Sequence, residues 1–174
     1  GREDFMRKKK GIFILFSIMV LFVLLGLIKN EVKAAEIVES GKSGDLDWTI
    51  DREGCLTITG NGNYDFDGRV DGYGVPKWCE YHIKKAIIDV KEITDCCRMF
   101  YGCNILQQIE FANFDTSQVV NMSGMFQGCG KLKNLDVSCF ETSQVTNMSG
   151  MFQGCSNLEK LDLSKFDTSQ ITDM

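Results

Sequence analysis

The chain has 174 residues, 44% of them hydrophobic and 25% charged, which is typical of folded proteins and excludes a disordered chain. Its single histidine, His82, excludes metal sites that are built from several histidines. Residues 1–35 hold seven basic and three acidic side chains, whereas residues 36–174 hold twelve basic and 21 acidic ones. Residues 36–174, the body of the chain, therefore lack the basic surface of nucleic-acid-binding proteins, and we expect no nucleic-acid partner.

Residues 1–35 have the pattern of an export leader. Basic residues at 7–10 precede an uncharged apolar run from Gly11 to Ile28, and small residues follow at Ala34 and Ala35. This order is typical of a secretory signal peptide, and we expect cleavage after Ala34. The alternative is an uncleaved membrane anchor, because a helix over this run reaches about 27 Å, close to the thickness of a bilayer core.

Residues 36–87 are expected to form a β-rich N-terminal cap. Within them, Leu46, Trp48 and Ile50 alternate with polar residues, a turn signal follows at 51–54, and the alternation then resumes. This pattern predicts a β-hairpin over 46–60. The glycine-rich stretch that comes next indicates a loop. Stacked repeats need a terminal unit that covers their exposed core, and this segment precedes a repeat.

Residues 88–174 carry a repeat of 26 residues. Residues 114–139 and 140–165 agree at 18 of 26 positions, residues 88–113 fit the same frame loosely, and residues 166–174 begin a fourth copy. One copy cannot bury its apolar side chains alone, so the copies are expected to stack and share a core. Because the chain ends inside a copy, we expect it to be a piece of a longer protein.

Each copy combines two apolar patterns. Met122, Met125 and Phe126 stand at i, i+3 and i+4, which predicts a short helical turn that ends at Gly128. The L-x-x-L-x-V spacing at 132–137 predicts a short strand with one apolar face. The predicted fold class is therefore α/β: a leucine-rich-repeat solenoid of short parallel strands and helical turns, with an N-terminal β-hairpin cap.

Three of the eight cysteines, Cys103, Cys129 and Cys155, recur with the repeat and are predicted to form a ladder of buried free thiols. Oxidation of neighbours is the alternative, because exported chains often use cysteine for disulfides. The other five allow up to two bridges that sequence cannot assign. Zinc is a sharper alternative, but Cys96 and Cys97 lack the C-x-x-C spacing of structural zinc sites, and we expect no metal and no cofactor.

Outward strand positions align as a ladder of carboxylates, Glu110, Asp136 and Asp162, which are the candidate binding residues. Stacked carboxylates repel one another. They would therefore dock a basic partner, hold calcium weakly, or form a solvated face that prevents sheet aggregation. A second polar ladder, at 115–117 and its copies, is predicted to fix turns, with calcium as the alternative.

No catalytic residue is predicted. Ser123 and Ser149 are copies of one position in the repeat, whereas a catalytic residue normally occurs once. The sequence has no nucleophile elbow, phosphate loop or zinc-protease motif. An acyl-transfer triad would need His82 as its base. We therefore expect a non-catalytic protein.

The hairpin followed by VPKWCEYHIKKAIID, and the repeat FETSQVTNMSGMFQGCSNLEKLDLSKF, resemble BspA-like leucine-rich-repeat surface proteins over roughly residues 45–174. The resemblance implies an exported bacterial protein, extracellular or at the cell surface, that binds a protein or another surface macromolecule and mediates adhesion without catalysis. A passive stalk or scaffold of a longer surface protein is the alternative. Contact with a membrane is expected only through an uncleaved leader.

Overall fold

The computed structural model describes residues 35–65 and 75–174. The expected leader, apart from Ala35, lies outside the described residues. The chain divides into two compact units, 1–36 and 37–174, and the elements below belong to the second. Among the described residues, no helix is both long and apolar enough to span a bilayer.

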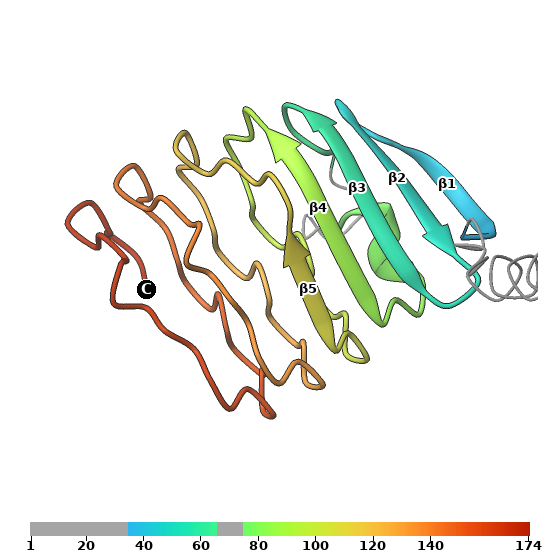
Figure 1. Cartoon of the computed structure of the whole chain (residues 1–174). Coiled ribbons are helices and arrows are strands. Elements are labelled where there is room, and N and C mark those ends of the chain that lie inside the picture. Colours follow the sequence, from blue (N-terminus) through green and yellow to red (C-terminus); the bar gives the residue numbers. More distant parts are fainter. Residues whose placement is uncertain (1–34, 66–74) are drawn as a thin grey trace, which may run out of the picture. The chain divides into compact units, whose positions relative to one another are not determined.

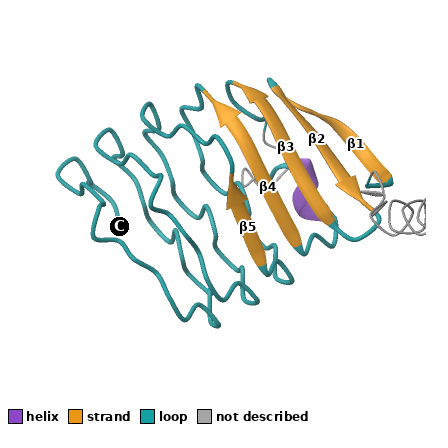
Figure 2. Cartoon of the chain, in the orientation of Figure 1, coloured by secondary structure: helices purple, strands orange, loops and turns teal. Residues whose placement is uncertain are grey.

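The second unit contains a five-stranded mixed sheet whose strands lie side by side in chain order (Figure 1). The strands are β1 (Ile37–Ser43), β2 (Leu46–Asp51), β3 (Cys55–Asn61), β4 (Lys85–Lys91) and β5 (Gln108–Phe111). The first three pair antiparallel, and β3, β4 and β5 pair parallel. The one helical element in the described part of the chain is a single 3₁₀ turn, η1 (Lys77–Glu80) (Figure 2).

The hairpin predicted over 46–60 is confirmed. β2 and β3 pair with Trp48 opposite Ile58 and Ile50 opposite Leu56, and the turn between them contains Gly54 at a φ of 82°. The alternating apolar side chains of both strands are buried. Sequence reasoning missed β1, because most of its side chains are exposed and no apolar alternation marks it.

The predicted α/β fold class, a leucine-rich-repeat solenoid with helical turns, is wrong: the described residues form strands and turns, and no helical turn occurs in the copies. In 122–129 the odd-numbered amides from 125 to 129 donate to carbonyls three residues earlier, but the even-numbered ones from 124 to 128 donate to the next copy. An α-helix needs every amide to bond four residues back. Positive φ angles at Gly124 and Gly128 also interrupt helical geometry.

The short strand predicted in every copy forms only in the first one, as β5. In the later copies the equivalent residues Asn134 and Lys160 make an isolated parallel bridge, and bridges outside this strand position, such as Asn121 with Asn147, also join the copies. Positions 26 residues apart therefore lie side by side, and the chain after β5 continues beside it in successive irregular passes (Figure 1).

Repeated apolar side chains stack in columns within one core. Phe100, Phe126 and Phe152 stack with ring centroids 5.8 and 5.7 Å apart and planes within 5° of parallel. Phe126 and Met125 are fully buried, as the spacing predicts, and Phe152 of the last complete copy is half-buried. The core prediction was therefore correct even though the backbone around it is not helical.

The polar ladder that begins at Asp115 fixes turns, as predicted, and its threonines also join the copies. Asp115 Oδ1 accepts the Ser117 N–H at 3.0 Å. Thr116 is buried, and its hydroxyl donates to the Glu141 carbonyl at 3.1 Å and accepts the Glu141 N–H at 2.7 Å. Thr142 repeats this bridge one copy later. Buried hydroxyls with two partners stabilise the contact between copies.

Candidate functional site

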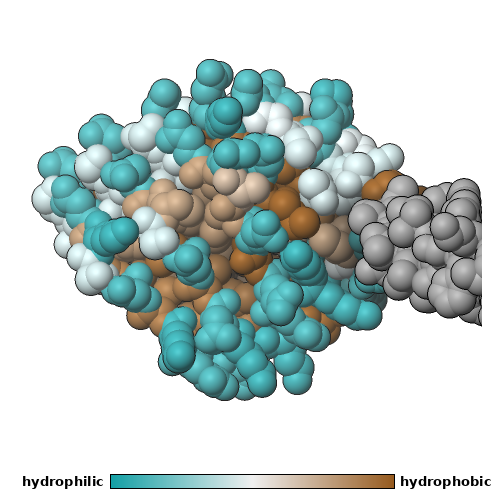
Figure 3. Space-filling model, viewed as in Figure 1, coloured by the Kyte–Doolittle hydropathy of each residue, from teal (hydrophilic) through white to brown (hydrophobic). Residues whose placement is uncertain are grey.

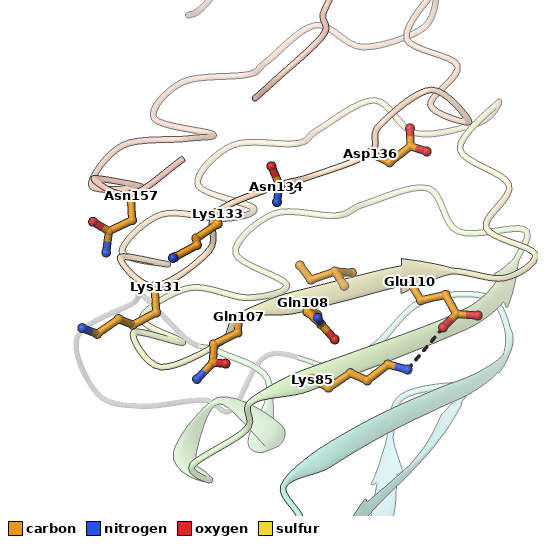
Figure 4. Close-up of a pocket in the computed structure, with 10 residues that line it drawn as sticks. Lys85, Gln107, Gln108, Glu110, Lys131, Lys133, Asn134, Asp136 and Asn157 are labelled. Atoms are coloured by element: carbon orange, nitrogen blue, oxygen red, sulfur yellow. Dashed lines mark ion pairs between the residues drawn. The ribbon is translucent and has the colours of Figure 1, made fainter. Parts of the chain in front are cut away.

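A polar groove of about 780 Å³ crosses β4, β5 and the two copies that follow (Figure 4). Its lining is almost entirely charged and amide side chains: Lys85, Gln107, Gln108, Ile109, Glu110, Lys131, Lys133, Asn134, Asp136 and Asn157. A second hollow of about 680 Å³ shares Asn134 and Asp136 with it and continues to Lys160 and Asp162. We call the first of these the polar groove.

The structure brings all three predicted binding residues to these two hollows. Glu110 and Asp136 line the polar groove, and Asp136 and Asp162 line its continuation. Glu110 forms an ion pair with Lys85 at 3.4 Å, from β5 to β4 (Figure 4). Both partners are accessible to solvent, so this pair adds little to stability.

Asp136 and Asp162 have a local role that sequence reasoning did not foresee. Each Oδ1 accepts a backbone N–H at 2.9 Å, from Ser138 and Ser164 respectively. Hydrogen bonds from the side chains of the same serines, and to a smaller extent from their backbone N–H groups, lower the pKa of both carboxyl groups. The two aspartates therefore fix the turn after the strand position, and much of their hydrogen-bonding capacity is used within their own copy.

Lys131 and Lys133 are the groove residues that sequence reasoning missed. Both are exposed, and neither has an ion-pair partner among the described residues. They were missed because sequence reasoning followed the positions that the copies share. Asn157 stands at the position of Lys131 in the next copy, and Glu159 at that of Lys133.

The differences between copies concentrate at the polar groove. Eight of 26 positions differ between 114–139 and 140–165, and four of these fall within 130–134. Three of the four, at 131, 133 and 134, line the groove. The shared positions thus build the fold, while the groove changes its chemistry from copy to copy. That clustering was the sequence signal that could have found the site.

The residues weighed for catalysis lie apart from this groove. The hydroxyl of Ser123 donates to Cys97 Sγ at 3.2 Å, and that of Ser149 to Asn147 Oδ1 at 2.8 Å. His82 is exposed just before β4. Within the described ranges, no three histidine, cysteine, aspartate or glutamate side chains are grouped as metal ligands would be.

Apolar surface is exposed as well. Figure 3 shows it in the middle of the face seen in Figure 1, bordered by polar side chains. Met151, Phe152 and Leu163 of the last complete copy line an apolar pocket of about 340 Å³ together with Phe166 of the next copy.

One family description, "Mycoplasma protein of unknown function, DUF285", matches residues 79–174, more than half of the chain. The chain belongs to the DUF285 family. The DUF285 match begins within η1 and covers all of the repeats that the sequence shows. The resemblance to BspA-like leucine-rich-repeat proteins is therefore wrong as an assignment, since a different family matches and the fold lacks helical turns. Neither a curated protein nor a solved structure matches the chain significantly.

Proposed function

We propose that this DUF285 protein is an exported, non-catalytic binding module that holds a segment of another protein in the polar groove. The observation that carries the proposal is the contrast between constant and variable positions. Residues shared by the copies bury the phenylalanine column and bridge the copies, whereas three of the eight positions that differ, at 131, 133 and 134, line the groove. A repeated scaffold with variable exposed positions suits recognition of an extended partner.

The chemistry of the groove favours a partner segment that carries carboxylates. Lys131 and Lys133 offer two ammonium groups that no acid of the described chain pairs with, and Gln107 and Asn134 offer amides close by. Each exposed charge contributes little by itself, so affinity has to come from several contacts along the groove. The acidic body around the groove would repel a partner that is acidic throughout, and this favours a short acidic stretch.

The leader pattern supports export and a location outside the cell or at its surface. The polar groove supports binding rather than turnover, because its lining consists of lysine, amide and carboxylate groups that face solvent. Catalytic groups typically lie in water-excluded sites with strongly perturbed pKa values.

The proposal is tested by binding of the purified protein to a panel of extracellular matrix and cell-surface proteins. We expect saturable binding to at least one of them. Reversing charge in the double variant Lys131→Glu, Lys133→Glu should weaken it by about tenfold, which corresponds to about 1.4 kcal/mol. The matched control is Lys77→Glu in η1, an exposed lysine outside the groove lining. Equal loss in both variants would contradict the proposed site.

A passive stalk is the second candidate function. The buried threonine bridges and the aspartate turns favour it, because they stabilise the stack without needing any ligand. Absence of saturable binding to the whole panel, with the protein shown to be folded, would support the stalk and contradict the binding module.

A further inference from the structure

Cys103 differs from its two counterparts in the thiol ladder. Cys129 Sγ donates to the Phe100 carbonyl at 3.2 Å, and Cys155 Sγ donates to the Phe126 carbonyl at 3.1 Å, so each contacts the copy before its own. Cys103 belongs to the first copy. Its thiol instead donates to another thiol, Cys79 Sγ in η1, at 3.7 Å. All eight cysteines lie in the described part of the chain, and no other hydrogen bond found there joins two thiols.

The position of Cys79 is held by its neighbour in η1. Trp78 is fully buried, and its Nε1 donates to the Met99 carbonyl at 2.8 Å. Cys79 Sγ contacts the same carbonyl at 3.6 Å. Trp78 and Cys79 therefore pack on the first copy. The sulfurs of Cys79 and Cys103 are in van der Waals contact although no covalent bond joins them. The two sulfurs are less than 2 Å further apart than in a disulfide, whose S–S bond is about 2.05 Å.

We propose that Cys79 and Cys103 are a disulfide-forming pair that links η1 to the first copy. The inference does not depend on the polar groove or on its partner. It concerns a protein whose leader pattern predicts export to an oxidising environment, where low-molecular-weight disulfides and thiol oxidases act on exposed thiols.

The reaction proceeds by two exchanges with a disulfide oxidant, RSSR. The thiolate of Cys79, the more accessible of the two, attacks one sulfur of RSSR, and RS⁻ leaves while a mixed disulfide forms on Cys79. Cys103 then attacks Cys79 Sγ, the second RS⁻ leaves, and the protein disulfide is complete. Two thiol protons are released to solvent and take RS⁻ to RSH, and the two electrons lost by the cysteines reduce RSSR to two thiols.

Burial and the contact with Cys79 set the order of these steps. The hydrogen bond with Cys79 and, as the smaller cause, burial raise the pKa of Cys103 well above its usual value. Cys103 is thus a poor first nucleophile for an oxidant in solution. Once Cys79 carries the mixed disulfide, Cys103 lies beside the sulfur that it has to attack, and no approach through solvent is needed.

The experiment is incubation of the purified, folded protein with oxidised glutathione, then alkylation in denaturant and non-reducing peptide mapping. We expect titratable thiols to fall by two per chain, a mass lower by two hydrogen atoms, and one cross-linked peptide that joins Cys79 to Cys103. Cys129→Ser, one repeat further along, should leave this product unchanged, and Cys79→Ser should abolish it. Failure of the native wild-type protein to lose two thiols, or a linked peptide that joins Cys103 to Cys129, would overturn the proposal.

Discussion

The N-terminal end of the stack and the contacts between its copies satisfy the same row of backbone carbonyls in different ways. Between copies, carbonyls accept amides of the copy before: the Ser123 carbonyl accepts the Arg98 N–H, and the Met125 carbonyl accepts the Phe100 N–H, at 2.9 and 2.8 Å. In the first copy the equivalent carbonyls belong to Cys97 and Met99.

At this N-terminal end, side chains replace the missing amides. Tyr64 Oη donates to the Cys97 carbonyl at 2.7 Å, and Trp78 Nε1 donates to the Met99 carbonyl at 2.8 Å. The two rings also contact each other edge to face, with centroids 5.5 Å apart. The comparison teaches that a terminal unit can end a stack with two aromatic donors instead of a further strand, and that those rings cover the core at the same time.

Burial also differs along the phenylalanine column. Phe100 and Phe126 are fully buried, whereas Phe152 in the last complete copy is half-buried and lines a pocket together with the exposed Leu163.

The largest expected effect comes from truncating the phenylalanine column at its two ends. Phe100→Ala removes a fully buried ring and should lower the free energy of unfolding by about 3–5 kcal/mol. Phe152→Ala, at the equivalent position of the last complete copy, should cost less because its ring is only partly buried. Urea unfolding of both variants measures the difference. Equal losses would show that the two ends are equally covered.

Next in size is the loss of one donor at the N-terminal end. Tyr64→Phe keeps the ring but removes the hydroxyl, which leaves the Cys97 carbonyl without its 2.7 Å partner. We expect a loss of about 1–2 kcal/mol in the free energy of unfolding. Tyr101→Phe is the matched control, because Tyr101 is an exposed tyrosine of the first copy and should tolerate the change. An unchanged free energy of unfolding in Tyr64→Phe would show that this hydrogen bond does not stabilise the N-terminal end.

Acid should loosen the copies. Hydrogen bonds from serines two residues on lower the pKa of Asp115, Asp136, Asp162 and Asp167. A carboxyl group whose pKa is lower in the folded state adds stability that is complete above its unfolded pKa, near 3.8, and that is lost as pH falls below it. Thermal unfolding between pH 6 and pH 2.5 should therefore show a fall in Tm below about pH 4.

The matched variant for this pH effect is Asp136→Asn, Asp162→Asn, which retains the Oδ1 acceptor but does not titrate. It should lower Tm slightly at pH 6, because the contribution of the ionised carboxylates is lost, and it should reduce the further loss of Tm in acid. An unchanged acid response would mean that these turns do not set the pH dependence.

The smallest effect concerns a residue that distinguishes the first copy from the later ones. Arg98 has a φ of 59°, at the position where later copies place Gly124 and Gly150 with φ of 60° and 65°. Arg98→Gly should relieve this strain. It also removes the guanidinium contact over Tyr101 and gives the unfolded chain more freedom, so the net stabilisation should be less than about 1 kcal/mol. Gly124→Arg should destabilise, since Gly124 has a φ of 60°, which is strained for a residue with a Cβ. Chemical denaturation of the two variants measures both changes in the free energy of unfolding.

The sequence predicted the core and the hairpin well because both depend on apolar spacing. Phe126 and Met125 are buried in any regular stack of the copies, and the alternation around Trp48 specifies a half-buried strand wherever it occurs. The helical turn was wrong for a physical reason. An i, i+3, i+4 spacing also arises in a series of tight turns, and glycines at positive φ decide between the two.

The candidate site was predicted in part. Glu110, Asp136 and Asp162 do line exposed hollows, since outward positions of a stack align whatever the exact backbone. Lys131 and Lys133 could have been found only by asking where the copies differ. The donor roles of Tyr64 and Trp78 were beyond sequence reasoning, because they depend on side chains that meet the first copy from segments with no repeat pattern.

The most direct test of the central claim, that alternate amides join the copies, is hydrogen exchange of individual amides by NMR. We predict slow exchange for the N–H groups of Gly124, Phe126 and Gly128 and fast exchange for that of the exposed Gln118, which has no acceptor among the described residues. Fast exchange in the first three, or equally slow exchange at Gln118, would contradict it.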